Sequence, residues 1–219
     1  MMNVILTLAS DLHIGKVDKD LFAQETLLKM FIDGIENKEA VFSLHTNDGI
    51  VLFTVTGRNG RTIYTPEGEC TLINWSKHDL RGCIRLECLP NTVEEVDVQI
   101  NFLTGEVNLT DLPRSMVSLN VSDNVFTGYV ALTSLPHNLK RLNICRNQFC
   151  GSLDMTSLPS GLESLDISLN YFEGELDFDK LPSSLRTLNI STNEEISGQV
   201  QRSPERRVSI RNTKVVFKE

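Results

Sequence analysis

Residues 116–128 read MVSLNVSDNVFTG, and this stretch predicts one turn of a repeating β structure. Leu119 and Val121 alternate with polar residues, which is typical of a half-buried strand. Asn124 follows at the point where the chain must turn inward, and a buried asparagine amide can both donate to and accept from the backbone of neighbouring coils. Phe126 is then predicted to fill the interior of the coil.

The rest of this coil runs from Gly128 to the next Leu-Pro pair. Gly128 is predicted to permit a tight turn, and residues 129–132 alternate again, which predicts a second short strand. Leu135-Pro136 is predicted to close the coil, because proline cannot continue a helix. One coil cannot bury its apolar side alone, so the pattern requires neighbours of the same kind stacked on it.

The same pattern recurs at a fixed step of 23 residues, because the Leu-Pro pair begins at positions 89, 112, 135, 158 and 181. The asparagine keeps this step and predicts a buried structural ladder formed by Asn101, Asn124, Asn147, Asn170 and Asn193. The glycine recurs as Gly82, Gly105, Gly128, Gly151 and Gly174. The last full unit has one extra residue, near Glu194. A constant period of this length predicts a solenoid with one continuous core.

The unit can be written L-x-x-L-x-I-x-x-N-x-F-x-G-x-L-x-L-x-x-LP, and it resembles the leucine-rich repeat of the plant type. Its 23-residue form with Leu-Pro is similar to the expanded leucine-rich-repeat families of kinetoplastid and related protists. The resemblance implies a leucine-rich-repeat solenoid of parallel β strands with a second short-strand flank and little helix. It also implies a role in protein interaction and no more specific function.

The repeats predict a solenoid over residues 66–213, made of six coils and a closing strand and followed by a basic tail at 214–219. The first coil is degenerate, because His78 stands where the ladder asparagine would be. Residues 1–65 show no repeat, and we expect them to form a small α+β cap over the open end of the core. An uncovered end would expose apolar side chains and strand edges.

Local signals within this cap predict its elements. Val4–Ala9 could form a strand, and Asp18 or Asp20 could cap a helix that runs to about Asn37. Asn47-Asp48-Gly49 is a strong turn signal before the apolar run at 50–55, which is predicted to be a strand. One side of the predicted helix carries Leu21, Phe22, Leu28, Phe31, Ile32 and Ile35.

Charge and cysteine content limit the classes of partner and compartment. The formal net charge of −8 disfavours a nucleic-acid partner outside a larger assembly. Residues 201–219 carry six basic and two acidic residues, a net of +4, so the first 200 residues sum to −12. No run suits a membrane helix, and the N-terminus lacks the basic flank of a signal peptide. Five cysteines without that signal predict reduced thiols and an intracellular, cytoplasmic location.

One short motif suggests metal chemistry. Residues 10–15 read SDLHIG and resemble the first metal motif of metallophosphoesterases, which implies that Asp11 and His13 could ligate a di-metal centre. The later Gly-Asp and Gly-Asn-His motifs of those enzymes are missing, and the repeats occupy their place. Catalysis requires several convergent ligands, so we expect a polar loop here, with no enzyme activity and no cofactor. A metal-dependent phosphoesterase remains the least favoured alternative.

The solvent-facing strand positions predict a binding surface on the concave face. The positions that are Asn/Asp or Ser in nearly every coil are explained by the repeat itself. We therefore expect the positions that vary from coil to coil to contribute more to partner binding. Few of these positions are aromatic, and aromatic residues anchor tight interfaces, so we expect a charge-steered protein partner. The candidate residues are Glu95, Asp97, Gln99, Arg141, Asn143, Arg146, Asp166 and Leu169, with Ile100 beside them.

Two functional hypotheses follow from these observations. The first is a non-enzymatic scaffold that binds another protein, whose identity the sequence does not give. The alternative is a structural subunit of a larger assembly, ribonucleoprotein included, that docks through its basic C-terminal end. Salt dependence of the association would separate them, because an exposed cluster of like charges is strongly screened by salt.

Overall fold

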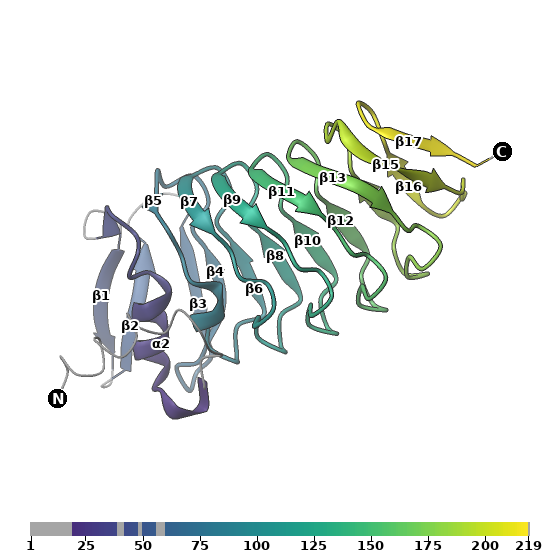
Figure 1. Ribbon diagram of the computed structural model, residues 1–219. Helices are drawn as coiled ribbons and strands as arrows, with labels where there is room; N and C mark the ends of the chain where they lie inside the picture. The colour runs from purple at the N-terminus through teal and green to yellow at the C-terminus, as the bar shows by residue number, and fades with distance from the viewer. Residues whose placement is uncertain (1–18, 39–41, 48–49, 56–59, 219) are drawn as a thin grey trace.

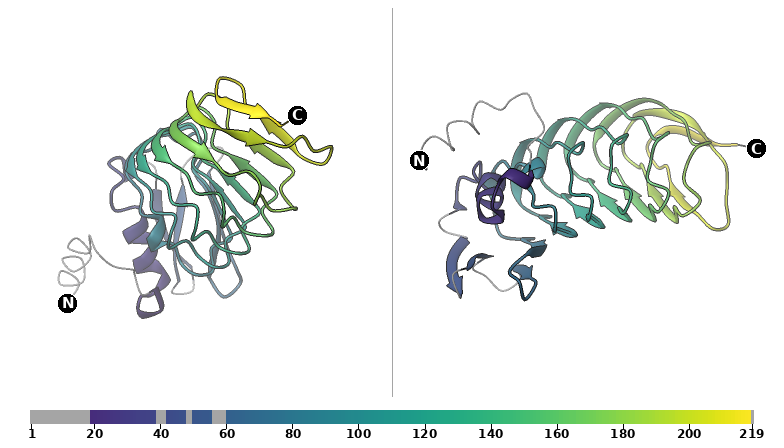
Figure 2. Two further views of the ribbon diagram at one scale, coloured as in Figure 1. Left: turned by 45° about the vertical axis from the view of Figure 1, so that its right-hand side comes forward. Right: turned by 90° about the horizontal axis from the view of Figure 1, so that it is seen from below.

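The computed structural model describes residues 19–38, 42–47, 50–55 and 60–218, and its main body is a stack of coils built on two sheets (Figure 1). Successive coils contribute one short strand to each sheet. The N-terminal cap and the last coil lie at opposite ends of the stack (Figure 2). This architecture confirms the solenoid predicted from the 23-residue period.

The first sheet has the strand order β16-β14-β12-β10-β8-β6-β4-β3. Its pairs are parallel, except that β3 runs antiparallel to β4. Neighbouring strands align the same repeat position, so Leu119 lies opposite Leu142, 23 residues later. The strands are β3 (Arg61–Tyr64), β4 (Cys70–Asn74), β6 (Glu95–Asp97), β8 (Ser118–Asn120), β10 (Arg141–Asn143), β12 (Ser164–Asp166), β14 (Thr187–Asn189) and β16 (Arg207–Ser209).

The second sheet, with the order β17-β15-β13-β11-β9-β7-β5, has a different register. Gly128 lies opposite Phe149, and Gly151 lies opposite Phe172, a step of 21 residues in each case. In the second sheet, the pairing between neighbouring central coils is therefore offset by two residues from the 23-residue period. The strands are β5 (Arg81–Gly82), β7 (Phe102–Glu106), β9 (Val125–Tyr129), β11 (Gln148–Ser152), β13 (Tyr171–Leu176), β15 (Glu195–Val200) and β17 (Lys214–Phe217).

The second strand of the coil lies earlier than the sequence predicted. We predicted a strand at 129–132 after a turn at Gly128, but β9 ends at Tyr129 and contains Gly128, whose φ is +85°. Alternating burial continues to Leu132, whereas the pairing with β11 ends at Tyr129. Alternation of apolar residues therefore located the buried side of the chain correctly but not the paired segment.

The cap covers the N-terminal end of the core, as predicted. Leu28 and Phe31 of its helix are fully buried, and the Phe31 ring centroid lies 5.5 Å from that of Trp75 in the first coil. Asn47 pairs with Ile50 across a hairpin, in agreement with the turn signal between them. The cap elements are η1 (Lys19–Leu21), α2 (Gln24–Phe31), β1 (Phe42–Asn47) and β2 (Ile50–Val55).

The bounds of the cap helix differ from the prediction. Helix α2 begins after Ala23, whose side chain makes no capping bond, and Asp20 lies in η1 instead. It ends at Phe31 rather than near Asn37, because the chain at Gly34 turns to dock on the solenoid, where Cys83 N donates to Gly34 O at 2.9 Å. The predicted strand Val4–Ala9 and the residues Asp11, His13 and Asp18 lie outside the described residues.

The predicted domain limits at 65 and 214 also differ from the structure. Strand β3 precedes residue 66 but belongs to the first sheet, where Thr62 lies opposite Ile73. At the other end, Lys214–Phe217 is strand β17 of the second sheet and not a tail. Val215 points inward and is buried. Lys214 begins the strand and Lys218 follows it, so the charge of this segment concealed its alternation.

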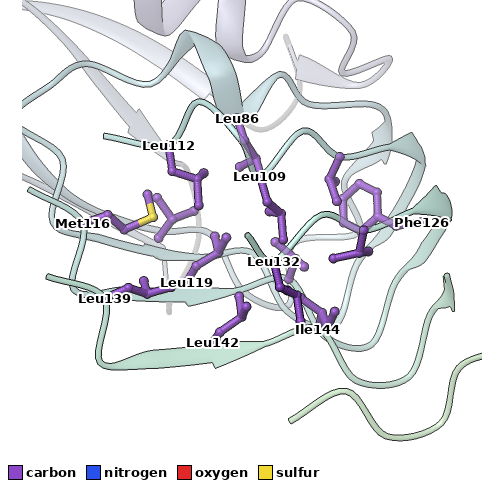
Figure 3. Close-up of a cluster of buried hydrophobic side chains, with 14 of the residues drawn as sticks. Leu86, Leu109, Leu112, Met116, Leu119, Phe126, Leu132, Leu139, Leu142 and Ile144 are labelled. Atoms are coloured by element: carbon purple, nitrogen blue, oxygen red, sulfur yellow. The ribbon is translucent and has the colours of Figure 1, made fainter. Parts of the chain in front are cut away.

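One apolar core runs through the whole stack (Figure 3). Leu119 and Leu142 of the first sheet and Ile144, just after β10, point into it, opposite Phe126 of the second sheet. The phenylalanine column is stacked from coil to coil, with ring centroids 6.3 Å apart between Phe126 and Phe149 and between Phe149 and Phe172. Adjacent coils therefore contact each other both through strand pairing and through the packing of their interior side chains.

The five ladder asparagines lie inside this core and connect adjacent coils. Asn147 Nδ2 donates to Val121 O at 3.1 Å in the preceding coil, and Asn147 Oδ1 accepts from Phe126 N at 3.1 Å. Asn124 Nδ2 donates to the same Val121 O at 3.2 Å, so consecutive asparagines share a carbonyl. The same inter-coil donation is made by Asn101, Asn124, Asn170 and Asn193.

Candidate protein-binding surfaces

The outward side chains of β4, β6, β8, β10 and β12 form what we call the first-sheet face. They line a groove of about 410 Å³. Of the predicted residues, the groove brings together Glu95, Asp97, Arg141 and Asn143. Arg141 Nη2 lies 3.5 Å from Glu95 Oε1, spanning β8, and both side chains are about half exposed. The groove therefore has a central charge pair that a partner could rearrange at little cost, since exposed pairs of this kind contribute about 0–1 kcal/mol.

The Asn/Asp column of this face closes the turn after each strand. Asp97 Oδ1 accepts from Gln99 N at 3.1 Å, and Asp166 Oδ1 accepts from Ser168 N at 2.9 Å. Gln99 Nε2 also donates to Asp97 Oδ2, so the predicted Gln99 side chain is folded onto its own strand. The same backbone bond is accepted by Asn74, Asn120, Asn143 and Asn189. This explains, without a ligand, why the Asn/Asp column hardly varies.

The predicted residues Arg146 and Leu169 lie on a ridge beside the groove and do not line it. Each precedes a ladder asparagine and has a left-handed backbone, with φ of +52° and +55°. Ile100 occupies the equivalent position, and Arg146 Nε pairs with Asp123 Oδ1 at 2.9 Å. The turn that buries each asparagine therefore pushes the preceding side chain into solvent.

Cysteine chemistry on this face is suppressed. Burial raises the pKa of the Cys145 thiol to about 11, and the carboxylates of Asp166 and Asp123 act in the same direction. The thiol therefore stays protonated at neutral pH and is a poor nucleophile. The five cysteines are free thiols in the structure. In the described part of the chain, no cluster of three or more His, Cys, Asp or Glu residues could hold a metal ion.

Sequence reasoning missed a second surface, which we call the second-sheet face and define by the outward side chains of β7, β9, β11 and β13. Tyr129 and Tyr171 are 76% and 69% exposed there, and Phe102 is 52% exposed. In the 23-residue alignment Tyr129 and Tyr171 occupy different columns. The two-residue shift per coil nevertheless places them in one row, on either side of Cys150. Only the register of the second sheet could have revealed this row.

No helix in the described residues is long and apolar enough to cross a membrane. The sequence matches no protein-family model and no curated protein.

The fold is nevertheless similar to solved structures of leucine-rich-repeat receptor kinase ectodomains. A pollen receptor kinase 3 structure is 24% identical, with a TM-score of 0.61 over 70% of this chain and 79% of that chain. The leucine-rich-repeat ectodomain of the receptor kinase SOBIR1 from Arabidopsis thaliana is 18% identical, with a TM-score of 0.59 over 80% of this chain and 95% of that chain. A chain of the BIR3–SERK2 complex from Arabidopsis thaliana is also 18% identical, with a TM-score of 0.52 over 74% and 87%.

At these levels of sequence identity the comparisons support the fold alone. The resemblance to protist families stays a prediction. The coil with two parallel sheets, the buried asparagine ladder and these structural neighbours agree. The protein has the fold of a leucine-rich-repeat solenoid with a small α+β cap at its N-terminal end.

Proposed function

We propose that the protein is a non-enzymatic binding module that holds a partner protein against its first-sheet face. The supporting observation is the groove with Glu95 and Arg141 at its centre, where the charges are half exposed and are not required by the coil. Elsewhere on this face the polar side chains are largely occupied by turn closure. One of the similar structures is a complex between two proteins, which agrees with a partner role for this fold. The free thiols support an intracellular location.

Charge reversal at Arg141 in the groove and at Arg146 beside it should separate binding from folding. The variant Arg141→Glu with Arg146→Glu should reduce recovery of the partner in affinity purification followed by mass spectrometry. Its melting temperature should stay close to that of the wild type, because the Arg141–Glu95 and Arg146–Asp123 pairs are exposed.

A matched control makes the same change of charge away from the groove. Lys140→Glu with Arg186→Glu disrupts two comparably exposed ion pairs at residues that do not line it. A protein recovered equally by wild type and both variants would place the binding site elsewhere and contradict the proposal.

The second candidate function, docking into a larger assembly through the C-terminal end, is favoured by one observation. Strand β16 is the last strand of the first sheet, and the exposed Arg207 and Arg211 lie in and beside it. Docking by these cations should weaken as ionic strength rises. We expect Arg207→Glu with Arg211→Glu to abolish co-sedimentation with the assembly at low salt. Unchanged co-sedimentation would exclude this candidate. Deletion of 214–219 is less suitable, because it removes β17.

A further inference from the structure

The second-sheet face contains a row of side chains that the fold does not need. Tyr129, Cys150 and Tyr171 lie opposite one another on β9, β11 and β13. Adjacent strands are about 4.8 Å apart, so the two tyrosines are separated by roughly 10 Å with a small side chain between them. One edge of the Tyr129 ring rests on Gly151, where an added Cβ would lie 2.4 Å from Tyr129 Cδ1. The ring is thus supported from below, and the residue remains largely exposed.

The strands that carry and border this row contain acidic but no basic residues. Strands β7, β9, β11 and β13 contain no lysine, arginine or histidine, but they contain Glu106, Glu173 and Glu175. Within the described residues, none of these three carboxylates forms an ion pair. Glu106 lies across Gly128, the residue next to Tyr129, because a Cβ on Gly128 would meet the Glu106 side chain. Negative charge therefore borders the aromatic row.

Two aromatic rings of this sheet already make cation–π contacts with arginine side chains of the same chain. At the N-terminal end, the Arg81 guanidinium lies 5.6 Å from the centroid of the Phe102 ring. At the C-terminal end, the Arg202 guanidinium lies 4.0 Å from the centroid of the Phe217 ring. In the described part of the chain, the two central tyrosines have no such cation over them. Both ends of the sheet thus carry an arginine on an aromatic ring, and the middle offers two more rings.

We propose that the second-sheet face binds an arginine-rich extended peptide segment of another protein. Its guanidinium groups stack on Tyr129 and Tyr171, with Glu106 and Glu173 supplying the countercharge. An extended strand presents alternate side chains to one side at about 7 Å intervals, and the long arginine side chains can spread to reach rings roughly 10 Å apart. This surface is distinct from the groove of the proposed function, and either can fail without the other.

The test uses a fluorescein-labelled synthetic peptide of alternating arginine and threonine, titrated with the full chain and followed by fluorescence anisotropy. Tyr129→Ser with Tyr171→Ser should weaken binding about tenfold, because each exposed cation–π contact contributes modestly. Glu106→Gln with Glu173→Gln should weaken binding and reduce its dependence on salt. Neither pair should change the melting temperature, since these side chains are exposed on the sheet.

Three controls define the specificity. Val216→Ser removes an exposed apolar side chain from β17 in the same sheet and should leave the affinity unchanged. Glu67→Gln with Glu69→Gln removes two exposed carboxylates beside the β3–β4 turn and should have a smaller effect than the Glu106 and Glu173 pair. A peptide with glutamate in place of arginine should not bind.

Several results would overturn the proposal. They are no binding of the arginine peptide, equal affinity after both tyrosines are replaced, and equal affinity for the glutamate peptide. A dimer seen in sedimentation that the tyrosine substitutions abolish, without peptide binding, would assign this face to a second copy of the chain.

Discussion

Asn147→Leu should lower the free energy of unfolding by about 3 kcal/mol, although leucine has the same branched side-chain skeleton as asparagine and the site is deep in an apolar core. The substitution removes the acceptor of Phe126 N and the donor to the carbonyls of Val121 and Ile144. A buried backbone group left without a partner costs about 1–3 kcal/mol. The network is shared between coils, so the loss should not be confined to one of them. Urea denaturation followed by circular dichroism measures the effect.

The matched control is Asn138→Ala. Asn138 also donates to a backbone carbonyl one coil away, that of Arg114 at 3.0 Å, but the side chain is exposed. Water can replace this bond, so the expected change is below about 0.5 kcal/mol. If Asn147→Leu costs no more than this control, the ladder contributes nothing to stability beyond filling space.

Gly82→Ala should detach the cap from the solenoid and cost about 4 kcal/mol. Gly82 has a φ of +89°, and a Cβ there would lie 2.1 Å from Gly34 O in the cap. Left-handed strain and the clash with backbone each contribute about 1–3 kcal/mol. The sole tryptophan, Trp75, is buried against Phe31 of the cap and serves as a local reporter. Its emission should shift to longer wavelength when the cap is displaced.

The same repeat position later in the chain supplies the control. Gly174 has a φ of +91°, but a Cβ there would meet only Ser152 Cβ at 3.4 Å. Gly174→Ala therefore carries the backbone strain without the clash, and it should cost about 1–2 kcal/mol. Trp75 emission should not change in this variant. Equal losses and equal emission in the two variants would show that the cap does not depend on the contact at Gly82.

Residues that repeat with the period could be located from the sequence because their surroundings repeat as well. The positions of Leu119, Asn124 and Phe126 in the coil follow from alternation and from the needs of a buried turn. The end of helix α2 could not be found in this way, because it depends on the contact between Gly34 and Cys83, which are far apart in sequence. Local propensity contains no information about that contact.

The candidate site was predictable only in part for a similar reason. The column containing Glu95 and Arg141 could be assigned because the first sheet aligns identical repeat positions. Arg146 and Leu169 were assigned to the same surface, but the left-handed turn before each ladder asparagine moves them to its edge. The row of Tyr129 and Tyr171 depends on the register of the second sheet, which pairs residues 21 apart and cannot be derived from a 23-residue period.

The unequal steps of the two sheets constrain how a protein of this kind can evolve. In the first sheet, duplication of one coil places a copy of each residue directly opposite the original on the adjacent strand. A charged residue there is therefore repeated at the same position of the face. In the second sheet, residues opposite one another come from different positions of the repeat. A duplicated coil would therefore place a different residue type in the row. Tyr129 and Tyr171 stand at different positions of the repeat, so duplication of one coil does not by itself place both tyrosines in the row. Inserting a coil between them would break the row.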